Sequence, residues 1–167
     1  MAWSRNHPHD PTERAYHSLV ALLPDPWSVD EFVGLVAGDR RRHIRVLPHD
    51  LTTGDATGYA LRRRSEDVIV VPIKAVGARR DAIICHELAH IVLGHAPMVT
   101  DDIAFMSMLA PHSPPDLVAR FLPRDGYDTD DERAAETLAT RLIARAQTRN
   151  HQRTANGELD RLTTRLR

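Results

Sequence analysis

Residues 68–95 constrain the fold of this chain most, because a strand-like run is followed there almost directly by a helical pattern. Residues 68–73 form the most apolar short run in the sequence, which predicts a buried strand. In residues 79–95 the apolar positions recur with the helical period, and Gly94 marks the predicted end of that helix. A buried strand beside a helix of this length indicates a core that combines both kinds of element.

Helical patterns also lie on both sides of this stretch. Residues 12–23 have helical spacing, and Ser28 with Glu31 fits a capping box, in which side chains bond the free backbone N–H groups at a helix start. A long helix is predicted over residues 130–149. Gly157 is expected to separate it from a short amphipathic helix that follows.

Two further strand-like runs complete the predicted sheet. Residues 44–47 form a short β-like run, and residues 59–63 can pair with residues 68–73 across a tight turn. The sequence therefore predicts an α+β fold in which a small, mostly antiparallel sheet of three strands packs on a helical core.

The length and composition fit one ordinary globular domain. The chain has 167 residues, of which 42% are hydrophobic and 27% charged, and no apolar run approaches the roughly 18 residues of a membrane span. We expect a flexible N-terminus over residues 1–11, a single domain over residues 12–149 and a helical tail over residues 150–167. The lone cysteine, Cys85, excludes a disulfide within the chain, and residues 1–10 lack the apolar segment of a secretory signal, so we expect a cytoplasmic location.

The charge balance argues against direct binding to nucleic acid. The formal net charge is -1, so the chain has no overall basic field. Residues 40–43 and 62–64 are basic runs, but aromatic residues are only 5% of the chain and do not interleave with these arginines. We expect the runs to be solvated or to dock an acidic partner, and we expect no membrane partner.

A pentapeptide that begins at His86 and ends at His90 lies within the predicted helix over residues 79–95. Helical positions four apart share a face, so both imidazoles can meet one metal ion. Glu87 lies one position along, where it can reach a water molecule beside the metal as a general base. Two imidazoles, an open coordination position and a carboxylate base are the working parts of a zinc hydrolase.

Catalytic zinc sites commonly have a third protein ligand, and Glu132 is the best candidate for it. Glu132 and Glu136 share one face of the predicted helix over residues 130–149. Glu132 can therefore ligate the metal while Glu136 accepts the free N–H of a ligating histidine. Structural roles stay open for both carboxylates, because Thr129 with Glu132 also fits a capping box and Glu136 fits a solvated helix surface.

His95 and Cys85 are weaker candidates for the metal. Five helical positions separate His95 from His90, a rotation of about 500° that places it about 140° off the face. His95 is expected near the C-terminal end of the helix, where the helix dipole favours a cation. Cys85 points about 100° away from His86 and is expected to be a small buried apolar residue.

Three segments together resemble the ImmA/IrrE family of small zinc metallopeptidases. They are the strand over residues 68–72, the helix over residues 82–95 and the stretch from Glu132 to Ala139. The family's usual form is a strand, a helix that carries H-E-L-x-H and often L-G-H, and a later helix with E-x-x-A-[N/D]-x-[F]-A. The resemblance covers about residues 28–147. The segments at its two ends are similar to an actinobacterial branch of the family, whose members are described as toxins or regulators.

What the resemblance implies is a cytoplasmic, zincin-like metallopeptidase domain with narrow specificity. Members of the family cut, or otherwise relieve, a helix-turn-helix transcriptional repressor or antitoxin. The resemblance therefore implies a zinc-dependent endopeptidase with such a protein as its substrate. Two positions depart from the family pattern: Glu136 stands where the family has Asn or Asp, and Leu138 where it has Phe.

One different class of function stays open, a metal-binding regulatory module that relieves a repressor by protein–protein contact without cutting it. The methionine-rich segment over residues 98–108 and the amphipathic C-terminal helix can form its contact surface, or can simply pack on the core. An enzyme needs a further donor to the developing oxyanion, and His95, His112 and Tyr127 are the candidates.

Overall fold

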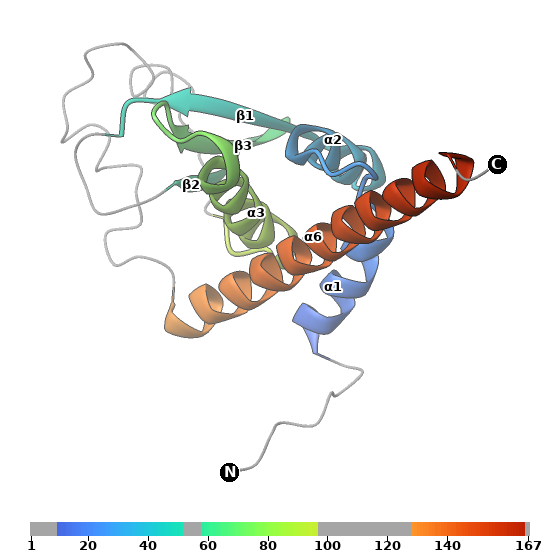
Figure 1. Cartoon of the computed structure of the whole chain (residues 1–167). Helices are drawn as coiled ribbons and strands as arrows, with labels where there is room; N and C mark the ends of the chain where they lie inside the picture. Colours follow the sequence, from blue (N-terminus) through green and yellow to red (C-terminus); the bar gives the residue numbers. More distant parts are fainter. Residues whose placement is uncertain (1–9, 52–57, 97–127, 166–167) are drawn as a thin grey trace.

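A computed structural model describes residues 10–51, 58–96 and 128–165, with side chains described as far as residue 155 (Figure 1). The elements in chain order are α1 (Pro11–Ala21), α2 (Val29–Asp39), β1 (His43–His49), β2 (Tyr59–Arg62), β3 (Glu66–Pro72), α3 (Gly77–Leu93) and α6 (Thr129–Arg165). These elements make the α+β fold that the sequence predicts. Within the described ranges, no helix combines the length and apolar character that a membrane span requires.

The three strands form one sheet in the order β1-β3-β2, with β3 in the centre. β2 pairs with β3 in antiparallel fashion, and Tyr59 lies opposite Val70. β1 pairs with β3 in parallel, and His43 lies opposite Glu66. The sheet is therefore mixed, and the prediction of a mostly antiparallel sheet is wrong.

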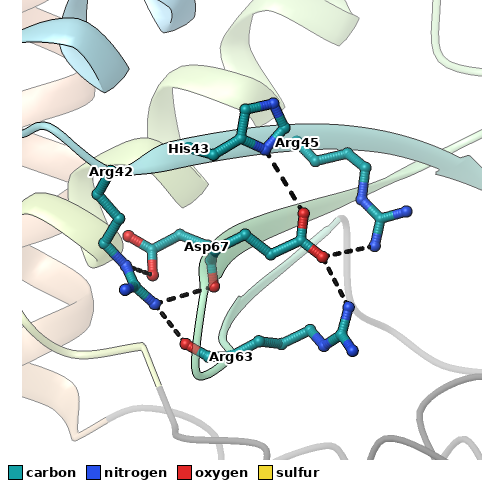
Figure 2. A network of polar contacts seen from close by, with 6 residues as sticks. Arg42, His43, Arg45, Arg63 and Asp67 are labelled. Carbon is teal, nitrogen blue, oxygen red and sulfur yellow. Dashed lines mark hydrogen bonds and ion pairs between the residues drawn. The ribbon is translucent and has the colours of Figure 1, made fainter.

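The mixed pairing has a local and a long-range cause. A turn over residues 63–65 joins β2 to β3, and so short a connection forces the two strands to run antiparallel. β1 is set beside β3 by Arg42, which directly precedes it (Figure 2). The Arg42 guanidinium donates to the Asp67 carboxylate over 2.7 Å, to the Glu66 carbonyl over 3.0 Å and to the Arg63 carbonyl. These bonds hold the start of β1 next to the start of β3, which fixes the parallel register.

A second carboxylate strengthens this end of the sheet. Glu66 accepts from Arg45 over 2.9 Å and from Arg63 over 2.6 Å, while His43 Nδ1 lies 3.5 Å from its other oxygen. Asp67 is only 1% exposed, and its buried negative charge is compensated by Arg40 and Arg42, which follow the end of α2. Some arginines of the two basic runs, which were predicted to be solvated or to dock a partner, therefore form ion pairs that stabilise the sheet.

The helices lie against one face of the sheet and against each other (Figure 1). α3 packs on β2 and β3, and α6 packs along both α3 and α1. Both faces of β3 are buried: Ile69 and Val71 join the helical core, while Val68 and Val70 form a smaller cluster with Leu61. Burial on both faces explains why β3 reads as a continuous apolar run.

Helix ends follow the sequence signals in two places and depart from them in a third. The Ser28 hydroxyl accepts from the Glu31 backbone N–H over 3.3 Å, as the capping box predicts. Gly94 ends α3 with a φ of 85°, a left-handed conformation that suits glycine. The predicted helix break at Gly157 is wrong, because α6 runs without interruption from Thr129 to Arg165. One glycine costs a helix about 1 kcal/mol, and a helix of this length tolerates that loss.

Candidate metal centre

α3 and α6 bring the predicted ligands together. His86 and His90 lie one turn apart on α3, with their Nε2 atoms 3.1 Å from each other. Glu132, in the first turn of α6, reaches across to both: its two carboxylate oxygens lie 3.0 Å from His86 Nε2 and 3.3 Å from His90 Nε2. The three side chains therefore offer donor atoms within 4.8 Å of one another.

The spacing of these donor atoms fits a small tetrahedral cation. Ligand bonds of about 2.0–2.1 Å place the donor atoms of a tetrahedral site about 3.3 Å apart. The nearest separations here are 3.1 Å between the two imidazole nitrogens, 3.0 Å from His86 Nε2 to one Glu132 oxygen and 3.3 Å from His90 Nε2 to the other, and with one oxygen counted the three donor atoms lie within 4.8 Å of one another. Two nitrogens and one carboxylate oxygen are also the donor types of catalytic zinc sites. The three residues can therefore hold a divalent metal ion.

The protonation of the two histidines suits the same role. Burial, together with repulsion from His86 and His95, lowers the pKa of His90 to about 3. His90 is therefore neutral near pH 7, as a metal ligand must be. His86 Nδ1 lies 3.3 Å from the Glu136 carboxylate. A proton on that nitrogen donates to Glu136 and leaves the Nε2 lone pair directed at the site.

The way α6 begins leaves the Glu132 side chain free of a capping role, so that it can face the two histidines. Asp128, one position earlier than the predicted cap, lies ahead of the helix, and its carboxylate accepts from the backbone N–H of Asp130 over 3.2 Å. The Glu132 N–H donates to the Asp128 carbonyl over 2.9 Å. Because Asp128 does the capping that the sequence assigned to Thr129, the Glu132 side chain does not fold back on the helix start and instead faces α3.

Glu87 lies beside the three donors in a buried position. Its side chain is only 3% exposed and faces β2. Burial, with a smaller contribution from the negative charge of Glu132, raises the pKa of Glu87 to about 8 against the opposing effect of a backbone hydrogen bond from Ala60. Within the described part of the chain, Glu87 Oε2 is a buried atom without a hydrogen-bond partner. An unpartnered carboxylate oxygen next to a metal site can accept a proton from water.

Gly58, just before β2, makes this placement possible. A Cβ atom on Gly58 would lie 2.6 Å from the Ile83 side chain and 3.0 Å from Glu87 Oε1. Real atoms do not approach so closely, so a side chain at this position would push β2 away from α3. Gly58 therefore lets the backbone of the edge strand approach the Glu87 carboxylate. The sequence indicated only a turn there.

The structure also places the weaker candidates. His95 Nε2 lies 3.2 Å from Asp131 Oδ1, outside the donor group that includes Glu132. Cys85 is fully buried, and burial raises the pKa of its thiol to about 12, as expected of a small core residue. His112, Tyr127 and the methionine-rich segment lie outside the described residues. Asp131, which this contact brings into view, has no signal in the sequence beyond its place in an acidic first turn.

Comparison with protein-family models and with curated proteins found no match to this chain. The case for a function therefore depends on the residues and geometry described above.

Proposed function

We propose that the protein is a zinc-dependent endopeptidase with a zincin-like active site, of the kind found in the ImmA/IrrE family that its motifs resemble. One observation carries the proposal: His86, His90 and Glu132 converge from two helices, and the buried Glu87 carboxyl group lies near enough to Glu132 for the two charges to interact. Structural ion pairs do not need two histidines one turn apart, a carboxylate from a second helix and a buried acid with an oxygen that lacks a hydrogen-bond partner in one place. A hydrolytic metal site needs all of them.

The roles of the residues follow from their positions. Zinc held by His86, His90 and Glu132 would polarise the scissile carbonyl and activate water near neutral pH. Glu87 would take the proton of the attacking water and deliver it to the leaving amine. Glu136 would hold His86 in the ligating tautomer through the Nδ1 contact.

The edge strand β2 offers a place for an extended peptide. β3 is the central strand of the sheet, so the edge next to Glu87 is β2. Among the described strands, β2 is paired on one side only, with β3. A peptide added along its other side would make main-chain hydrogen bonds and pass the Glu87 carboxylate. The substrate class, a helix-turn-helix repressor or antitoxin in the cytoplasm, comes from the family resemblance alone.

The test is Glu87→Gln in zinc-loaded protein, incubated with a helix-turn-helix repressor as the candidate substrate and examined for fragments by mass spectrometry. We expect zinc to remain bound and cleavage to fall by at least about 10²-fold, the contribution of a general base. Glu31→Gln, on the exposed side of α2, is the matched control and should cleave normally. Full cleavage by Glu87→Gln would remove Glu87 from this role. Repressor release by Glu87→Gln without any cutting would favour the non-cleaving regulatory module.

A further inference from the structure

Glu132 lies in the part of α6 that packing secures least. The first buried residue of α6 is Ala135, one turn further on, and Thr129, Asp130 and Arg133 are all exposed. The Glu132 side chain is itself 50% exposed. The first turn of a helix also frays most easily, because its N–H groups have no partners within the helix. Something other than the apolar core has to fix Glu132 opposite the two histidines.

The contact between His95 and Asp131 can hold this first turn of α6, because Asp131 is the residue next to Glu132. His95 Nε2 lies 3.2 Å from Asp131 Oδ1, and the imidazole is only 14% exposed. Gly94 turns the chain at the end of α3, which allows the His95 N–H to donate to the His90 carbonyl over 2.8 Å. The His95 ring then lies against the His90 ring, with centroids 5.4 Å apart. His95 is therefore fixed to the helix that carries the other two ligands.

We propose that His95 and Asp131 form a clamp that positions Glu132 for metal binding; this inference rests on the proposed metal site. Adjacent helical residues point about 100° apart, so Asp131 and Glu132 contact α3 in two different directions. Two such contacts fix the rotation of α6 about its own axis as well as its distance from α3. His95 is a positioning residue in this account. Its Nε2 is directed to Asp131 and lies outside the group of three donors, so the clamp acts on the metal through Asp131 and Glu132.

The chain offers a matched control for this clamp in Asp130. Asp130 is the neighbouring acid in the same first turn, and it should make a similar favourable interaction with the helix dipole. Its side-chain partner is Arg133, on the same helix, at 2.9 Å, with both side chains exposed. Asp130→Ala therefore removes the same charge from the same turn without touching any link to α3. A general effect of helix destabilisation should appear in both variants, and a clamp only in Asp131→Ala.

The experiment measures Zn²⁺ affinity of the full chain by competition with a chromophoric chelator. We expect Asp131→Ala and His95→Ala each to weaken binding by about tenfold, the lower end for residues that orient ligands. Asp130→Ala should stay within about twofold, since exposed pairs contribute little. The double variant of His95 and Asp131 should bind no more weakly than His95→Ala alone, because that substitution already removes the contact with Asp131. Asp131→Asn, which keeps an acceptor for the imidazole N–H, should recover part of the loss.

The absorption of Co²⁺ bound in the same site separates positioning from loss of stability. A well-placed Glu132 gives the intense visible bands of four-coordinate Co²⁺, and Asp131→Ala should weaken them while Asp130→Ala leaves them unchanged. Equal zinc affinities and equal cobalt spectra for the two alanine variants would refute the clamp while leaving the metal site intact. Failure of the wild-type chain to bind either ion, or binding that Glu132→Ala does not weaken, would instead overturn the proposed metal site itself.

Discussion

Replacement of Glu87 by glutamine should change how the stability of the metal-free protein depends on pH. Glu87 is 3% exposed, and burial raises the pKa of its carboxyl group from the ordinary value of 4.5 to about 8. Between these two values the folded protein keeps a proton that the unfolded chain has lost. The free energy of unfolding must therefore fall as the pH rises through this range. Glutamine resembles the protonated acid in shape and hydrogen bonding and has no proton to lose.

The size of the effect follows from the same two values. Each pH unit between 4.5 and 8 removes about 1.4 kcal/mol of unfolding free energy, and the loss levels off above pH 8. At pH 8 the accumulated difference between Glu87→Gln and wild type is about 4 kcal/mol relative to pH 4.5. A domain of this size loses about 2–4 °C in melting temperature per kcal/mol, so the gap should widen by about 10 °C.

The assay is thermal unfolding of both proteins in chelator, followed by circular dichroism from pH 4.5 to 8.5. Glu31→Gln on α2 serves as the control, since its exposed carboxylate should leave the pH dependence of wild type unchanged. The curves of wild type and Glu87→Gln should separate steadily as the pH rises. Parallel curves for these two proteins would refute the buried state and raised pKa of Glu87 on which its proposed role as a base depends.

Three further predictions concern the packing, the sheet and the metal. Gly58→Ala should destabilise the protein by about 1–3 kcal/mol and lower peptidase activity, because the new methyl group would meet the Ile83 side chain and the Glu87 carboxylate. Gly34→Ala, in α2 with open space around it, should be neutral or stabilising in the same denaturant titration. Asp67→Ala should lower the free energy of unfolding in urea by about 3–5 kcal/mol, because it leaves arginines without their buried partner; a loss below about 1 kcal/mol would contradict this. Removal of bound zinc with a chelator should abolish cleavage and lower the melting temperature, and added zinc should restore both.

Much of the local structure could be predicted from the sequence, because local patterns determine it. The period of α3 placed His86 and His90 on one face, and Ser28 specified the start of α2. The short turn before β3 specified the hairpin. The meeting of Glu132 with the two histidines could also be anticipated, since a metal site needs a third donor and the acidic start of a long helix supplied one.

What could not be predicted depends on contacts between residues far apart in the chain. The parallel pairing of β1 follows from Arg42 reaching Asp67 and the hairpin carbonyls, and a run of arginines does not reveal which of them binds a buried acid. The contact of His95 with Asp131 depends on how α6 crosses α3, which has no signature in either segment. The approach of Gly58 to Glu87 is hidden for the same reason, because a glycine in a sequence indicates freedom of the backbone and not what lies against it.

X-ray absorption spectroscopy of the zinc-loaded protein tests the central claim most directly, because it reports the atoms bound to the metal. The account predicts one zinc ion per chain with two imidazole nitrogens and a carboxylate oxygen at about 2.0–2.1 Å, and loss of the protein oxygen in Glu132→Ala. A spectrum that showed sulfur ligands, or no imidazole nitrogens, or no change in Glu132→Ala, would contradict a metal centre formed by His86, His90 and Glu132.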